Sequence, residues 1–138
     1  MNGGLVKKVI GVVAGLAAWI AVVAVAGIIM RSSWPAYARV ADAMTFTLPM
    51  MLARLSIGAV ATLAAGWVTA ALAPRPLLVR LIPGIILLAA FIPQHIALWH
   101  TFPIWYHLTF LLSLVPLTYL GGLQGLQKST SAARLSDV

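Results

Sequence analysis

The feature that most constrains this chain is a series of four apolar runs, each long enough to cross a lipid bilayer. They cover about residues 9–30, 49–73, 77–97 and 103–120, and the only Lys, Arg, Asp or Glu residues in them are Arg54 and Arg80. A helix rises 1.5 Å per residue, so about 20 residues cross a hydrocarbon core of ~30 Å. We therefore expect an all-α integral membrane protein, a four-helix bundle of antiparallel spans.

The composition agrees with lipid as the main solvent of the surface. Of the 138 residues, 62% are hydrophobic and 8% charged, whereas soluble domains average about 25% charged residues. The net charge is +7, but the basic residues are scattered singly at the ends of apolar runs. Nucleic acid is therefore not expected as a partner, because phosphate contacts need several cations on one surface. The absence of Cys excludes disulfides and thiolate metal sites.

The segments between the runs indicate how the spans are connected. Residues 31–44 combine charges with aromatic residues and predict a connection in the headgroup region. Pro74-Arg75-Pro76 predicts a helix stop and a short turn. We expect residues 1–123 to form a single membrane domain, and residues 124–138 are polar and predict a disordered tail.

The first run has a second interpretation, a cleavable signal peptide. Lys7 and Lys8 precede it, and Ala24-Val25-Ala26 before Gly27 resembles a cleavage site. The apolar stretch continues through Met30, however, and this length favours a membrane span.

The distribution of Lys and Arg predicts the orientation. If the N-terminus is cytoplasmic, six basic residues fall on that side and three on the other. The six are Lys7, Lys8, Arg75, Arg80, Lys128 and Arg134. The three are Arg31, Arg39 and Arg54. Because cytoplasmic segments carry the excess of Lys and Arg, we expect a multi-pass membrane protein with both termini in the cytoplasm.

Small residues recur at every fourth position on two of the runs. The stripes are Gly11 and Gly15 on the first run, and Gly58, Thr62 and Gly66 on the second. Such stripes let helix backbones approach closely. They predict packing among the four helices of one chain, with a homodimer interface as the alternative.

Three histidines lie near the expected outer end of the third and fourth runs. They are His95, His100 and His107, with Trp and Tyr residues between them. Three imidazoles are suitable ligands for zinc, copper or haem iron. Their spacings match no short metal motif, and His, Trp and Tyr also suit a membrane interface without any ligand. We expect no cofactor and keep a histidine-bound metal as an alternative.

Arg54 is the charge that the second run places inside the membrane. A charged residue in a span is costly and suggests a functional site. Arg54 lies about six residues from the outer boundary, roughly 9 Å deep, which is also within reach of the headgroups. We expect an anchoring or functional role, with Asp42, Tyr106, helix carbonyls or lipid phosphate as partners.

Enzyme motifs are absent from the sequence. It has no phosphate-binding glycine loop, zinc-protease helix motif or nucleophile elbow. The two acidic residues, Asp42 and Asp137, lie outside the apolar runs, so paired-carboxylate catalysis lacks its parts. We expect no catalytic residues and no enzymatic activity.

The stretch ARLSIGAVATLAAGWVTAALAPRP, followed by FPIWYHLTFLLSLVPLTYLGG, resembles a group of small bacterial four-span inner-membrane proteins. The shared features are an Arg entering the second span, a Gly-rich middle, an Ala-Pro-Arg-Pro turn and a last Trp-Tyr helix ending in Leu-Gly-Gly, over about residues 50–122. The resemblance implies a bacterial inner membrane and four helices, and it implies no activity.

These observations favour a structural, accessory or interaction component of the inner membrane, with a homo-oligomer or a second membrane protein as its partner. A small oligomeric transporter or channel is the first alternative, although few polar residues are present to line a midplane site. A histidine-ligated metal or haem protein is the second.

Overall fold

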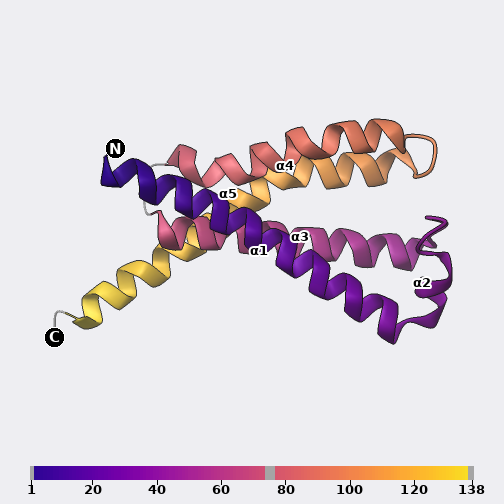
Figure 1. The fold of residues 1–138 in the computed structure, drawn as a ribbon, viewed down its shortest axis with the longest axis horizontal. Coiled ribbons are helices and arrows are strands. Elements are labelled where there is room, and N and C mark those ends of the chain that lie inside the picture. Colours follow the sequence, from indigo (N-terminus) through magenta and orange to yellow (C-terminus); the bar gives the residue numbers. More distant parts are fainter. Residues whose placement is uncertain (1, 74–76, 137–138) are drawn as a thin grey trace.

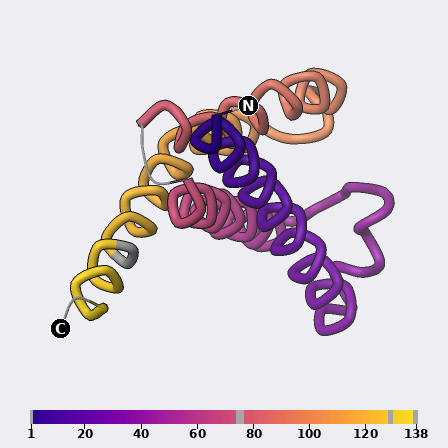
Figure 2. The backbone as a smooth tube through the Cα atoms, turned by 60° about the vertical axis from the view of Figure 1, so that its left-hand side comes forward, coloured from indigo at the N-terminus to yellow at the C-terminus, as the bar shows by residue number. Residues whose placement is uncertain are grey.

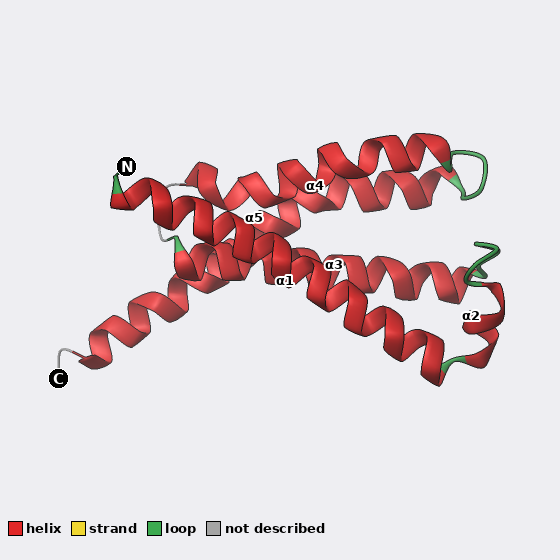
Figure 3. Ribbon diagram, viewed as in Figure 1, coloured by secondary structure: helices red, strands yellow, loops and turns green. Residues whose placement is uncertain are grey.

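The chain folds into five helices in the computed structural model, which describes residues 2–73 and 77–136, without the side chains of residues 128 and 129. The helices are α1 (Gly3–Ser33), α2 (Pro35–Val40), α3 (Leu48–Leu72), α4 (Leu77–Ala97) and α5 (Ile104–Ser136). Within the described ranges there is no strand (Figure 3). Four helices, α1, α3, α4 and α5, are long and apolar enough to cross a membrane. The all-helical class and the four apolar helices are thus confirmed.

The helix boundaries follow the apolar runs most closely in the middle of the chain. The α4 helix covers the expected residues 77–97, and α3 begins one residue before the expected Pro49. This proline is tolerated because the first turn of a helix needs no amide donor there. The expected turn at Pro74-Arg75-Pro76 lies outside the described residues.

The end helices are longer than expected. The α1 helix continues to Ser33, and the Ser32 and Ser33 hydroxyls both donate to the Ile29 carbonyl. The α5 helix runs through Ser136, where we expected a disordered tail from residue 124. No proline follows Pro116 in the sequence, and the Thr130 hydroxyl satisfies the Leu126 carbonyl. Polarity alone therefore did not end this helix.

The connection after α1 contains a short helix that the sequence analysis did not predict. Trp34 leaves the helical conformation and Pro35 starts α2 at its first position. Tyr37 of α2 is buried with Ala41 and Met50. The connection therefore packs against the bundle as part of the fold.

The α3 helix lies at the centre and contacts α1, α4 and α5 (Figures 1 and 2). A Cβ atom on Gly11 would lie 2.7 Å from the Cβ of Ala73, and one on Gly15 would lie 2.7 Å from the Ala65 carbonyl oxygen. On the other side of α3, a Cβ on Gly66 would overlap the Thr118 carbonyl of α5. These glycines therefore lie at helix contacts within the chain.

The centre of the bundle joins α1 to α3 by a buried polar contact. Trp19 Nε1 donates to the Thr62 hydroxyl at 3.2 Å, and this hydroxyl donates to the Gly58 carbonyl at 2.7 Å. The outer surface carries large apolar side chains, such as Leu78 and Leu112, which are 70% and 71% exposed. This distribution suits a bundle surrounded by lipid, because every buried polar group needs an internal partner there.

The helices separate toward one end of the bundle. In Figure 1, α4 and the start of α5 form one pair, and α1 and α3 lie below them, with α2 beyond their ends. Figure 2 shows the same divergence from another side. Side chains from all five helices line the candidate site in this region.

Candidate functional site

A cavity of about 300 Å³ lies between the diverging helices. Its walls come from α1, α2, α3, α4, α5 and the segment between α4 and α5. The lining side chains include Trp19, Val23, Met30, Tyr37, Arg54, Ile57, Phe91, Gln94, His95, Leu98, Phe102, Tyr106 and Phe110. They combine a mainly aromatic surface with a few polar groups, which is typical of small-molecule sites.

Arg54 is the cation of this cavity, and two tyrosines hold its guanidinium. Its Nη1 donates to the Tyr37 hydroxyl at 2.8 Å, and its Nε donates to the Tyr106 hydroxyl at 3.3 Å. Its Cζ lies 4.6 Å from the centre of the Phe46 ring, in cation–π contact. The arginine is thus fixed by neutral aromatic residues from α2, α5 and the connection before α3.

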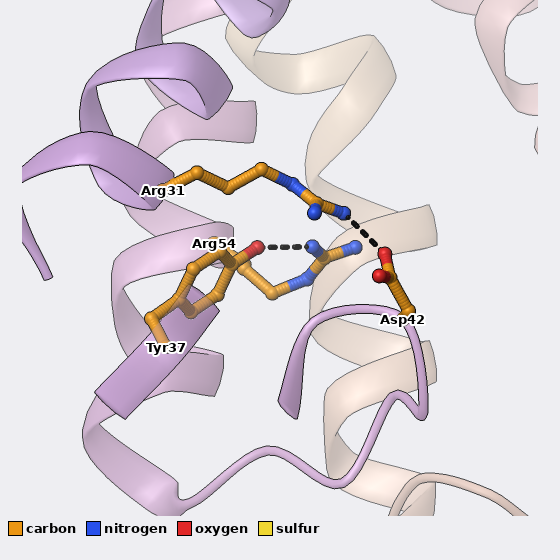
Figure 4. A network of polar contacts seen from close by, with 4 residues as sticks. All are labelled: Arg31, Tyr37, Asp42 and Arg54. Carbon is orange, nitrogen blue, oxygen red and sulfur yellow. Dashed lines mark hydrogen bonds and ion pairs between the residues drawn. The ribbon is translucent and has the colours of Figure 1, made fainter. Parts of the chain in front are cut away.

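Asp42 does not neutralise Arg54, contrary to one of our expectations. Its Oδ1 accepts a hydrogen bond from Arg31 Nη2 at 2.9 Å, and Figure 4 shows this pair beside the Arg54–Tyr37 contact. The Arg31–Asp42 pair is exposed and joins the end of α1 to the segment that follows α2. Tyr106 was correctly expected as a partner of Arg54, whereas Tyr37 was missed.

The hydrogen-bonding capacity around Arg54 is only partly used. A guanidinium only donates, so both tyrosine hydroxyls act as acceptors and each keeps its own O–H for donation. In the described part of the chain, neither hydroxyl donates to a protein group, and Arg54 Nη2 has no hydrogen bond. No acidic side chain is found among the described residues that line the cavity. The site therefore presents the two tyrosine O–H groups and the unused N–H groups of Nη1 and Nη2 around one positive charge.

The rest of the cavity wall is a continuous series of aromatic contacts. The His95 ring lies near Tyr106, with centroids 6.4 Å apart, and Phe91 lies 6.4 Å from His95. The Phe91 ring in turn lies 5.3 Å from Trp19. The cavity thus has a polar end at Arg54 and an apolar end at Trp19 and Val23.

The structure brings two of the three expected histidines together. His95 Nδ1 and His107 Nδ1 lie 2.7 Å apart and share one hydrogen bond. His100 is exposed and has no contact with this pair among the described interactions. Among the described residues no three His, Cys, Asp or Glu side chains are placed to hold a metal ion. The geometry thus provides a pair of imidazoles in place of the expected triad.

Most residues of the site carried no separate signal in the sequence. Arg54 was evident as a charge in an apolar run, but its aromatic neighbours come from three separate segments of the sequence. Tyr37 was among the aromatic residues of segment 31–44 that were interpreted as headgroup anchors, and Phe46 carried no prediction. Only the packing of α2 and the segment after it onto the bundle shows that Tyr37 lines the cavity and that Phe46 contacts Arg54.

Comparison of the chain with protein-family models, with curated proteins and with solved structures found no match. The cavity and its residues are therefore interpreted from their own geometry and chemistry.

Proposed function

We propose that this chain is an accessory component of the bacterial inner membrane that binds an amphipathic anion in the aromatic cavity. The observation that carries this proposal is the Arg54 guanidinium, which lies in an apolar cavity beside two tyrosine hydroxyls and without an acidic partner among the described residues. Binding defines the activity; no bond is made or broken.

The charge of Arg54 selects the sign of the ligand. A cation removed from bulk water is costly unless an anion or several hydrogen bonds compensate it. The tyrosine hydroxyls accept hydrogen bonds from Nη1 and Nε but bring no negative charge. A carboxylate or phosphate near Nη2 would supply that charge and accept from both tyrosine hydroxyls.

The remainder of the cavity selects an apolar body for the same ligand. Trp19, Val23 and Phe91 offer hydrocarbon and ring faces and no charge. An acyl chain or ring placed there gains about 25 cal/mol for each Å² of apolar surface removed from water. The ligand class is thus an anionic group attached to a hydrocarbon chain.

The proposal also includes the membrane in which the chain lies and the orientation of its helices there. We place four antiparallel spans in the bacterial inner membrane with both termini in the cytoplasm, supported by the six-to-three distribution of Lys and Arg. The cavity then lies in the outer half of the bilayer, because Arg31, Arg39 and Arg54 mark that side. Amphipathic molecules of the outer leaflet would reach it without crossing the membrane.

Native mass spectrometry of the chain in non-ionic detergent tests the proposal. Purified protein is offered equal amounts of dodecanoate and dodecanol, which share the chain and differ in charge. We expect retention of dodecanoate over dodecanol. The Arg54→Gln variant should bind dodecanoate about tenfold more weakly or worse, because a charged hydrogen bond contributes about 1.5–3 kcal/mol.

The matched control is Arg39→Gln, which removes the same charge at the same end of the bundle. Arg39 is exposed and does not line the cavity, so dodecanoate binding should stay at the wild-type level. Equal retention of the acid and the alcohol, or an Arg54→Gln variant that binds like wild type, would contradict the proposed function.

A further inference from the structure

The His95–His107 pair adds an imidazole to the polar groups of the cavity. His95 is half-buried and lines the cavity, whereas His107 is fully buried, with an exposure of 0%. Their Nδ1 atoms are 2.7 Å apart, so one nitrogen carries a proton and the other accepts it. Two neutral arrangements satisfy this contact, and they differ in which ring donates.

The buried environment of His107 distinguishes the two arrangements. Its Nε2 is buried and has no partner among the described residues. If His107 accepted at Nδ1, its proton would sit on Nε2 as an unsatisfied buried N–H, which is rare in proteins. If His107 donates from Nδ1, Nε2 is a bare acceptor. The second arrangement avoids a buried donor without a partner.

When His107 donates from Nδ1, the tautomer of His95 is determined as well. His95 then accepts at Nδ1 and carries its proton on Nε2. Trp99 stacks on the His107 ring, with centroids 5.0 Å apart and planes at 16°, which holds the imidazole in place. His107 therefore acts as a positioning residue, and His95 Nε2–H is left as a donor at the cavity.

We propose that His95 Nε2–H donates to a second acceptor oxygen of the bound amphipathic anion, with His107 fixing the donating tautomer. This inference rests on the proposed function, because Arg54 supplies the site for the anionic group. The His95 and Tyr106 rings lie 6.4 Å apart at 25°, and the Tyr106 hydroxyl contacts Arg54. The second acceptor thus lies within a few bonds of the anionic group.

A donor at His95 restricts the class of ligand further. The ligand is an amphipathic anion with a neighbouring hydroxyl, keto or ester oxygen. Two sources share this chemistry: a 3-hydroxy or 3-oxo fatty acid, and a glycerophosphate lipid with an ester carbonyl near the phosphate. A plain fatty acid fills the Arg54 site and leaves the His95 donor unused.

Nitrogen NMR of the ¹⁵N-histidine-labelled chain in detergent tests the tautomers before any ligand is added. We expect the protonated nitrogens to be Nδ1 in His107 and Nε2 in His95. In His107→Phe, which keeps a ring to stack on Trp99, the preference of His95 for Nε2 should be lost. The opposite pair of tautomers in the wild type would overturn the proposal.

Binding measurements test the consequence for the ligand. Native mass spectrometry compares 3-hydroxydodecanoate with dodecanoate, and dodecanoyl lysophosphatidate with its ether analogue, which lacks the carbonyl. We expect wild type to prefer the ligand with the second acceptor by about threefold to tenfold in one of the two comparisons, as one hydrogen bond allows. The comparison that shows the preference identifies the source.

His95→Phe should abolish that preference and retain dodecanoate binding through Arg54. His95 is only partly buried, so this variant tests the donor even if His107→Phe does not fold. Binding of every anion without preference in wild type would overturn the inference and leave the proposed function standing. Binding of none of the four ligands would overturn both.

Discussion

Arg54 retains its charge within α3 because its neighbours accept its hydrogen bonds without cancelling that charge. Tyr37 and Tyr106 each accept one N–H, and Phe46 contributes its ring face. A planar guanidinium reaches both hydroxyls at once, whereas an ammonium is a compact point charge. The identity of this residue as Arg is therefore as important as its sign.

This geometry leads to a prediction for the Arg54→Lys variant. Lysine keeps the cation but cannot hold both tyrosine hydroxyls in fixed positions. We expect dodecanoate binding to weaken by about threefold to tenfold, as the loss of one net hydrogen bond predicts, with the melting temperature little changed. The measurement is native mass spectrometry combined with a thermal unfolding curve.

A purely anchoring role for Arg54 predicts a different result. Lysine also reaches the headgroups, so Arg54→Lys would then bind dodecanoate as wild type does. Arg39→Lys, at an exposed position of α2, serves as the control for the change of side chain alone.

At the scale of the helices, close approach depends on the absence of a Cβ atom at a few positions. Gly66 of α3 faces the Thr118 carbonyl and lies against Gly122 of α5, so a side chain at Gly66 has no space between the two backbones. Gly27 of α1 differs, because a Cβ there would meet nothing within 4 Å. The two glycines form a matched pair for measurement.

Gly66→Ala should destabilise the chain and Gly27→Ala should not. At Gly66 the new methyl group forces the α3 and α5 backbones apart, at a cost of about 1–3 kcal/mol. At Gly27 alanine reduces backbone freedom in the unfolded chain and stabilises the helix by about 0.5–1 kcal/mol. Thermal unfolding in mild detergent measures both, and equal melting temperatures would exclude Gly66 from the α3–α5 contact.

The sequence predicted which segments form long helices better than it predicted where the helices end or which side chains meet. The apolar runs identified α3 and α4 almost to the residue, because run length and flanking prolines define a span. The α2 helix and the continuation of α5 past Gln124 were missed, since neither has an apolar period. For the site, Arg54 and Tyr106 were identified, but the Arg31–Asp42 pair and the Tyr37 contact depend on tertiary packing.

On the scale of the whole molecule, the two ends of the bundle differ in the side chains that pack there. The end with the cavity holds the Phe46–Phe102 stack, with centroids 6.0 Å apart, and the His95–His107 pair. At the other end a Cβ on Gly122 would lie 2.9 Å from Arg80 Cδ, and one on Gly11 would meet Ala73. The proposed topology places the cavity in the outer half of the bilayer and the other end at the cytoplasmic side.

Cysteine labelling tests this topology directly, because the natural chain has no Cys. Single variants Ser33→Cys and Thr101→Cys, at exposed positions near the cavity end, should react with a membrane-impermeant maleimide in intact cells. Ser131→Cys, exposed on the last part of α5, should react only after the cells are broken. The reverse pattern would place the cavity on the cytoplasmic side.

The central claim is tested most directly by mapping which residues a bound acyl chain contacts. Dodecanoate carrying a terminal diazirine is photoactivated with the purified chain, and the adducts are mapped by peptide mass spectrometry. The account predicts adducts at the apolar end of the cavity, on Trp19, Val23 or Phe91, that are competed by dodecanoate and lost in Arg54→Gln. Adducts spread equally over exposed apolar residues such as Ile20, Val60 and Leu112, in wild type and variant alike, would contradict it.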